Sequence, residues 1–154
     1  MLYRCAAWTL TKATENIIRR TQRRMSRMVL GSGRRILEGD QLEGWVDWIK
    51  RSTRDVENRL EKLNLNDWVT TVRQRQWRWA RTLVTMTEDR WAHRAIHWTP
   101  EWHRGMRKQA RPHRRWHDHF TSFLLERGIT QHWSAVASTD VWSELESHFL
   151  AFQK

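Results

Sequence analysis

The chain has 154 residues, a formal net charge of +11 and 39% hydrophobic residues, of which 12 are tryptophan. Its single cysteine excludes an internal disulfide and a cysteine-based zinc site, and no apolar run approaches the roughly 20 residues that span a bilayer. The charge attracts polyanions, so we expect nucleic acid as a partner; an anionic membrane is the second candidate, and we expect no membrane partner. The single cysteine agrees with a reducing compartment, so we expect a nuclear or cytoplasmic location.

Charged residues are unevenly distributed along the chain. Residues 1–35 and 73–115 are strongly basic, whereas the stretches between and after them are mildly acidic. This layout predicts a basic N-terminal helix within 1–35, a helical middle segment over 36–98 and a C-terminal helical segment over 99–154. We expect the three segments to pack as one compact unit.

A first helix is predicted over 12–30, with Thr11 as its N-cap and Gly31 ending it. Apolar side chains recur at helical spacing and predict a packed face formed by Ile17, Ile18, Met25, Met28 and Val29. Most of the remaining surface of this helix is arginine, at Arg19, Arg20, Arg23, Arg24 and Arg27.

Two further long helices are predicted over 43–63 and 68–85. The first has pairs of opposite charge on its outer faces and an apolar stripe of Trp45, Ile49, Val56, Leu60 and Leu63. The second can be capped by Asn66 or Asp67 and has an apolar side of Val69, Val72, Trp79, Ala80 and Leu83.

The rest of the chain predicts shorter helices over 87–97, 115–127, 131–137 and 140–152, with a long basic loop around residues 99–113 that holds both prolines. No alternating strand pattern runs for more than a few residues. The expected fold is all-α, an irregular bundle of about five to seven helices.

Catalytic motifs are missing from the sequence. It has no glycine-rich phosphate loop and no recognisable pair of acids for two-metal chemistry, and no base accompanies Cys5. We therefore expect no enzyme activity, no cofactor and no small-molecule substrate.

The pairs His93/His97 and His113/His117 have metal-ligand spacing, but a zinc site requires three or four ligands, so we interpret them as polar surface.

The arginine-rich run 75–80 holds two tryptophans that point about 200° apart on a helix, so Trp77 and Trp79 cannot both face one core. Most tryptophans are expected to be core residues. Here one ring can instead stack on a base or contact an arginine, and we assign that role to Trp77 between Arg75 and Arg78. A membrane surface is a weaker fit because the basic helices lack a wide apolar face.

Five segments carry a further pattern: LYRCAAWTLTK at 2–12, RRTQRRMSRMVLG at 19–31, RQWRWA at 75–80, RPHRRWHD at 111–118, and spaced Trp, Ala, Asp, Leu-Glu and Phe over 133–149. In this order they resemble the thumb and C-terminal extension that follow the polymerase core of non-LTR (LINE-type) retrotransposon reverse transcriptases. The resemblance covers nearly the whole chain. Arg4 and Ala110 stand where that family favours glycine, and His117 and His119 flank a single acid, Asp118, where the family commonly has two.

This resemblance implies contacts with template RNA, primer or target DNA, and with the rest of a reverse transcriptase. The family's metal-binding Y-x-D-D loop would precede Met1, so we expect this chain alone not to act as an RNA-directed DNA polymerase. Matching basic positions and the arginine run together give the expected nucleic-acid-binding residues, which are Arg19, Arg20, Arg23, Arg24, Arg27, Arg75, Trp77, Arg78, Arg111, Arg114 and Arg115.

An alternative is a structural interaction module that packs on the polymerase core and has no binding function of its own. In that hypothesis the arginines only solvate the surface, and the helix over 12–30 presents an uncovered apolar patch. It predicts weak RNA binding that does not depend on salt.

Overall fold

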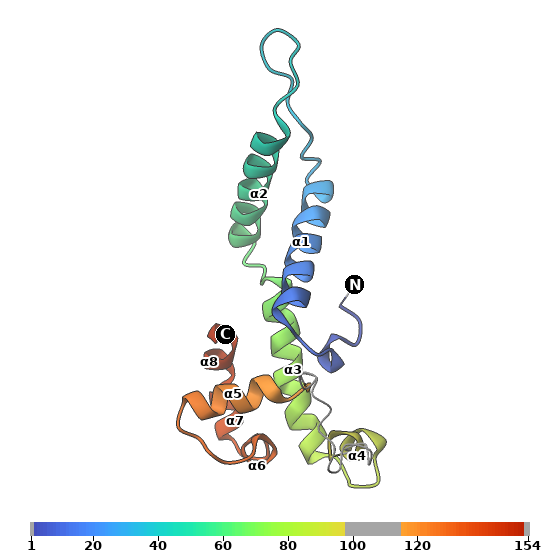
Figure 1. Ribbon diagram of the computed structural model, residues 1–154, viewed down its shortest axis with the longest axis vertical. Coiled ribbons are helices and arrows are strands. Elements are labelled where there is room, and N and C mark those ends of the chain that lie inside the picture. The colour runs from blue at the N-terminus through green and yellow to red at the C-terminus, as the bar shows by residue number, and fades with distance from the viewer. Residues whose placement is uncertain (1, 98–114, 153–154) are drawn as a thin grey trace, which may run out of the picture. The chain divides into compact units, whose positions relative to one another are not determined.

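A computed structural model describes residues 2–97 and 115–152, and only the backbone of residues 96 and 97 (Figure 1). The predicted all-α class is confirmed, since the described residues form helices and a single isolated bridge between Ile36 and Leu42. The helices are η1 (Cys5–Ala7), α1 (Lys12–Val29), α2 (Trp45–Lys62), α3 (Trp68–Thr85), α4 (Trp91–His97), α5 (Asp118–Glu126), α6 (Trp133–Ala137), α7 (Val141–Glu144) and α8 (Glu146–Ala151).

These eight α-helices exceed the predicted five to seven because the helix expected over 140–152 is two helices, α7 and α8, which meet at Leu145. The predicted basic loop around 99–113 lies outside the described residues. No helix in the described parts of the chain has both the length and the apolar content needed to cross a bilayer.

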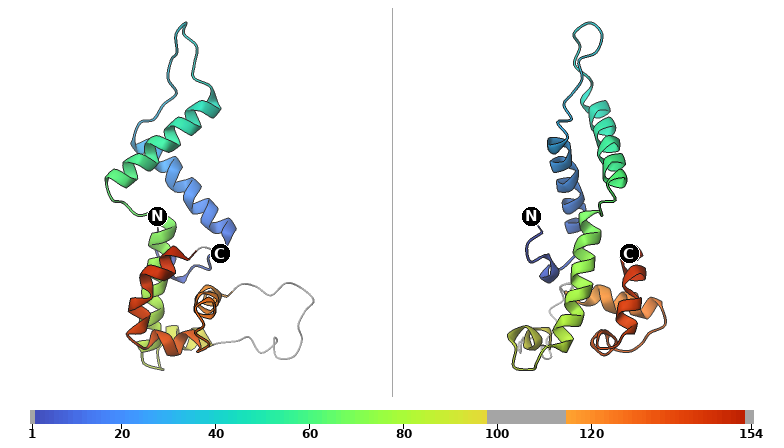
Figure 2. Two further views of the ribbon diagram at one scale, coloured as in Figure 1. Left: turned by 90° about the vertical axis from the view of Figure 1, so that its left-hand side faces the viewer. Right: turned by 180° about the vertical axis from the view of Figure 1, so that it is seen from behind.

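The chain divides into two compact units, which Figure 2 shows from two further sides. Thr11–Thr71 form one, here called the hairpin unit, and Met1–Leu10 together with Val72–Lys154 form the other, called the aromatic unit. This division differs from the three consecutive segments expected from charge, because the N-terminal residues belong with the second half of the chain.

Local capping determines where α1 begins and ends. The Thr11 Oγ1 accepts a hydrogen bond from the Thr14 backbone N–H at 3.2 Å, and the Thr14 Oγ1 accepts one from the Thr11 N–H at 2.8 Å. At the other end Gly31 has φ +60°, and the Ser32 N–H reaches back to the Arg27 carbonyl at 3.0 Å. The predicted cap Thr11 and the predicted end at Gly31 are therefore confirmed.

The apolar face predicted for α1 is wrong. Ile18 is buried, but Ile17, Met28 and Val29 are mostly exposed. The reason is that α2 lies against the arginine side of α1: Arg23 pairs with Glu57 at 3.0 Å, and the Arg27 Nη1 donates to the Thr53 hydroxyl at 3.2 Å.

The stripe predicted for α2 is correct only in its middle. Val56 is fully buried and Ile49 and Leu60 are half-buried, whereas Trp45 and Leu63 at its two ends are exposed. Few apolar side chains are therefore buried within the hairpin unit, and polar contacts supply much of its packing.

Aromatic side chains form the core of the aromatic unit. Trp77 and Trp142 stack face to face, with ring centroids 3.5 Å apart and planes within 3°. Each indole N–H donates to the other residue's backbone carbonyl at 2.9 Å, so both buried donors are satisfied. Further core residues around this pair are Ala80, Phe120, Phe123, Leu124, Trp133, Val136, Ala137 and Phe149.

The N-terminal residues are attached to this unit through their backbone carbonyls. The Arg75 Nη1 donates to the Leu2 carbonyl at 3.0 Å and the Trp116 Nε1 to the Ala6 carbonyl at 2.6 Å, while the buried Gln76 amide donates to the Trp8 carbonyl. Side chains from distant parts of the sequence thus hold residues 2–8, a mostly irregular segment, in place.

His117 gives this unit a pH dependence. Its ring stacks on Trp133 at 5.8 Å, and burial lowers its pKa below 6.5, although the Asp118 charge acts in the opposite direction. A pKa depressed in the folded state means that the unfolded chain binds the proton more tightly. The stability from neutral His117 is therefore complete above about pH 6.5 and decreases as the pH falls through the lower, folded-state pKa.

Urea denaturation of the wild-type chain and of His117→Gln between pH 7.5 and 5 measures this effect. We expect the wild type to lose more stability on acidification than the variant does. Equal losses would contradict the assignment, and His148→Gln, at an exposed histidine, is the control.

Candidate nucleic-acid interface

The five arginines of α1 fall into two rows. Positions one turn apart share a helix face, so Arg19, Arg23 and Arg27 form one row and Arg20 and Arg24 form the next. The two rows have different surroundings.

Acids and hydroxyls of the hairpin unit engage the first row. The Arg19 guanidinium lies 3.6 Å from the Asp67 carboxylate and 3.9 Å from Glu15. Arg23 pairs with Glu57, and the Arg27 guanidinium lies 5.8 Å from the centre of the Trp48 ring. Carboxylates partly compensate the charges of Arg19 and Arg23, and a hydroxyl and a ring already engage Arg27. All three are therefore weaker phosphate ligands than the sequence suggests.

Arg20 and Arg24 are exposed, and their side chains make no hydrogen bond or ion pair with any other residue that the structure describes. Both guanidinium groups therefore keep all their donors for a ligand. Two such forks four residues apart, about 6 Å along the helix axis, can grip neighbouring phosphates of a nucleic-acid backbone.

The arginines of α3 are bound within the aromatic unit. The Arg78 Nη2 lies 2.9 Å from the Glu146 carboxylate, while Arg75 donates to the Leu2 carbonyl and lies 3.7 Å from the Cys5 sulfur. Both side chains remain exposed to solvent, but each has an internal partner. The run 75–80 therefore joins the N-terminal and C-terminal parts of the unit.

The role expected for Trp77 is wrong. Trp77 is 1% exposed and lies at the centre of the core, whereas Trp79, which was expected in the core, is half-buried. The two rings do point to different sides of α3, as predicted, but α5, α7 and α8 supply the aromatic partners on the Trp77 side. A base cannot stack on Trp77 in this fold.

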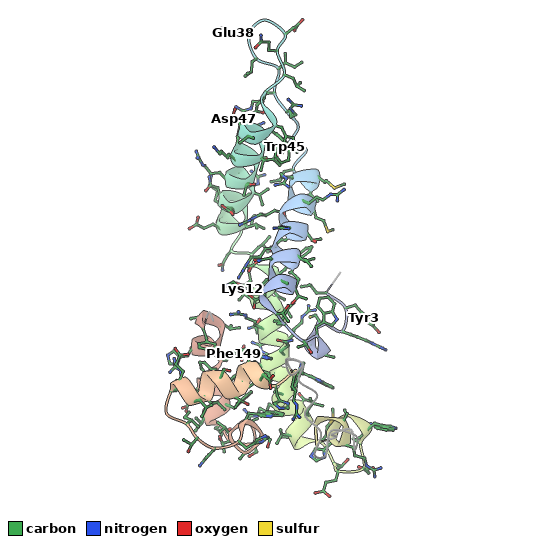
Figure 3. All side chains as sticks on the ribbon, viewed as in Figure 1. Tyr3, Lys12, Glu38, Trp45, Asp47 and Phe149 are labelled. Atoms are coloured by element: carbon green, nitrogen blue, oxygen red, sulfur yellow. The ribbon has the colours of Figure 1, made fainter. Side chains whose placement is uncertain are left out.

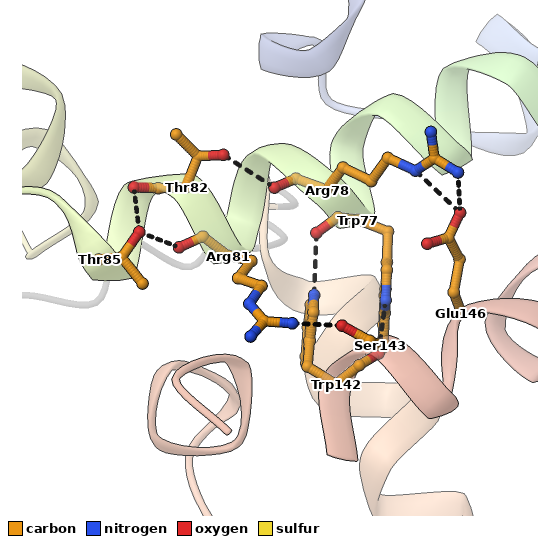
Figure 4. A pocket seen from close by; sticks show the side chains of 8 residues that line it. All are labelled: Trp77, Arg78, Arg81, Thr82, Thr85, Trp142, Ser143 and Glu146. Carbon is orange, nitrogen blue, oxygen red and sulfur yellow. Dashed lines mark hydrogen bonds and ion pairs between the residues drawn. The ribbon is translucent and has the colours of Figure 1, made fainter. Parts of the chain in front are cut away.

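A cleft of about 240 Å³ lies between α3 and α7–α8 (Figure 4). Arg78 and Arg81 line it, but Arg78 is paired with Glu146, and Arg81 is bonded to Ser143 and paired with Asp140 at 3.0 Å. Carboxylates in the wall of the cleft thus balance its cations, so the cleft attracts an anion more weakly than α1 does.

Of the remaining predicted residues, Arg115 is exposed at the start of the segment leading into α5, and its backbone N–H donates to Asp118 at 2.7 Å. Arg111 and Arg114 lie outside the described residues, as do His113 and the side chain of His97. Among the residues described, no three of the types His, Cys, Asp and Glu come together as metal ligands.

Sequence reasoning did not single out Arg54 and Arg59 of α2. Both are exposed, and neither side chain has an ion pair within the described part of the chain. Unlike Arg20 and Arg24, they are five positions apart, so they do not share one face of their helix. The sequence did not distinguish them because each basic residue of α2 has an acid nearby in the sequence, which suggested an ion pair.

The chain matches no protein-family model and no curated protein, and no solved structure matches its fold.

Proposed function

We propose that this chain is a non-catalytic nucleic-acid-binding module, with α1 as its binding face. The observation that carries the proposal is the pair Arg20 and Arg24, exposed on one helix face without internal partners among the described residues. The net charge of +11 supplies long-range attraction, and arginine provides the planar forks that grip phosphate oxygens.

The five ordered segments support a more specific origin, the thumb and C-terminal extension of a non-LTR retrotransposon reverse transcriptase. In such a protein the module contacts template RNA or target DNA beside the polymerase, in the nucleus or cytoplasm. The contacts of Arg75, Gln76 and Trp116 add a physical reason for the pattern, since they connect segments 2–12, 75–80 and 111–118 within one unit.

The proposal predicts binding that depends steeply on salt. Two phosphate contacts release counterions with a log–log slope of at least about −1.4 for single-stranded RNA and about −1.8 for duplex DNA. Fluorescence anisotropy of labelled RNA and DNA between about 50 and 300 mM salt measures these slopes.

The matched control is an oligomer of the same base sequence with an uncharged backbone, which should bind weakly and without a salt slope. A flat salt dependence with RNA, or equal affinity for the uncharged oligomer, would contradict the proposal. It would favour the alternative of a structural module whose arginines only solvate its surface.

A further inference from the structure

Residues 36–47 differ in chemistry from the rest of this basic chain. The segment contains Glu38, Asp40, Glu43 and Asp47 but no lysine or arginine, in a protein with 28 basic and 17 acidic side chains. Five of its eight other members are large and apolar, namely Ile36, Leu37, Leu42, Trp45 and Val46. We call residues 36–47 the acidic loop, although they include the first turn of α2.

The acidic loop has a defined shape. An antiparallel bridge joins Ile36 to Leu42, and the Leu37 N–H donates to the Gln41 carbonyl at 2.7 Å. The chain reverses at Gly39 and Asp40, which both have positive φ, at 79° and 57°. These conformations suit glycine and are tolerated by aspartate, so the turn is encoded locally.

A partly buried ion pair holds the base of the loop. The Glu43 carboxylate accepts bonds from Arg51 at 2.7 and 2.9 Å and from the Arg35 N–H at 3.1 Å. The hydrogen bond from Arg51 is the main cause that lowers the pKa of Glu43 from 4.5 to about 2. Glu43 therefore remains charged at neutral pH and belongs to the framework of the loop.

The apolar side chains of this framework are uncovered. Ile36 is 71% exposed and Trp45 62% exposed, and Leu37, Leu42 and Val46 are each more than half exposed. Val29, at the C-terminal end of α1, is also exposed. A concentration of exposed large apolar residues with a polar rim is the usual mark of an interaction surface.

The acidic side chains around these apolar residues indicate the kind of partner. Glu38, Asp40 and Asp47 are exposed, and their side chains have no ion pair within the described residues. Glu38, Trp45 and Asp47 lie at the loop end of the hairpin unit in Figure 3. Three uncompensated carboxylates repel phosphate, whether in nucleic acid or on an anionic membrane, and attract lysine and arginine.

We propose that the acidic loop is a protein-docking surface whose occupant is a basic amphipathic helix of a partner polypeptide. Apolar side chains of that helix cover Leu37, Leu42 and Trp45, and its lysines or arginines face Glu38, Asp40 and Asp47. Because the loop is held by Glu43 and Arg51, little ordering is required on binding. This surface is separate from Arg20 and Arg24 and does not depend on nucleic-acid binding.

The test uses the full chain and two labelled peptides. Both are amphipathic helices with leucine on one face; the other face is lysine in one peptide and glutamate in the other. Anisotropy should show at least about tenfold tighter binding of the lysine peptide. Leu37→Ser/Leu42→Ser should abolish the binding, and Glu38→Gln/Asp40→Asn/Asp47→Asn should remove the preference between peptides.

The control Glu61→Gln/Glu126→Gln/Glu144→Gln removes the same number of exposed acids elsewhere and should leave the preference unchanged. Circular dichroism checks that each variant is folded, and RNA affinity should not fall in the acidic-loop variants. The proposal is overturned if both peptides bind equally or if Leu37→Ser/Leu42→Ser binds normally.

Two other occupants are tested in parallel. Sedimentation that shows self-association, lost in Leu37→Ser/Leu42→Ser, would assign the surface to a second copy. Binding to neutral phosphatidylcholine vesicles, lost in the same variant, would assign it to a lipid surface. Either result without peptide binding overturns the proposal.

Discussion

Trp142→Ala is expected to lower the free energy of unfolding of the aromatic unit by about 3–5 kcal/mol. The side chain is 1% exposed and lies flat on Trp77, so its removal leaves a cavity in the middle of the core. It also removes the indole donor of the Trp77 carbonyl, which is then buried without that partner. Urea denaturation followed by far-UV circular dichroism measures the change.

Two further variants separate the stability lost to the cavity from the stability lost with the hydrogen bond. Trp142→Phe keeps most of the apolar volume but loses the donor, and we expect an intermediate loss of about 1–3 kcal/mol. Trp91→Ala is the matched control, since Trp91 is 83% exposed, and it should change stability by less than about 0.5 kcal/mol. A loss below about 1 kcal/mol for Trp142→Ala would contradict the stacked core.

Arg20→Glu/Arg24→Glu is expected to weaken RNA binding by roughly 100-fold or more at about 0.1 M salt. The substitution removes the two proposed phosphate contacts and places two carboxylates where phosphates would lie. Neither arginine has an internal partner among the described residues, so the hairpin unit should keep its fold. Anisotropy with single-stranded RNA measures the affinity, and circular dichroism checks helix content.

The matched control is Arg54→Glu/Arg59→Glu, which changes the net charge equally on exposed positions of α2. We expect it to weaken binding by less than about tenfold, through long-range repulsion alone. If the two double variants lose the same affinity, binding depends on total charge, and α1 is not a distinct binding face.

Helix positions followed from local features of the sequence. The Thr11 cap, the Gly31 stop and the glycine after α5, Gly128 with φ +74°, all act within a few residues of the helix end they determine. The predicted bounds of α3 agree with Trp68–Thr85, and those of α1 agree to within one residue. Hydrogen bonds inside a helix join residues four apart, so no distant contact is needed to place them.

The buried faces did not follow from the sequence. The periodicity of α1 offered an apolar arc with Ile17 and Met28, but α2 packs on the opposite side through Arg23 and Arg27. For α3 the spacing separated Trp77 from Trp79 without showing which ring the core would take. That choice depended on Phe120, Trp142 and Phe149, which are distant in the sequence.

The candidate site shows the same division. The sequence by itself determined the basic charge, the helices and the positions of all five α1 arginines, because charge and helix geometry are properties of composition and local spacing. Only the tertiary structure decided that Arg19 and Arg23 meet Asp67 and Glu57, while Arg20 and Arg24 form no hydrogen bond or ion pair with any described residue. Ion pairs between residues more than thirty positions apart form only once the chain is folded.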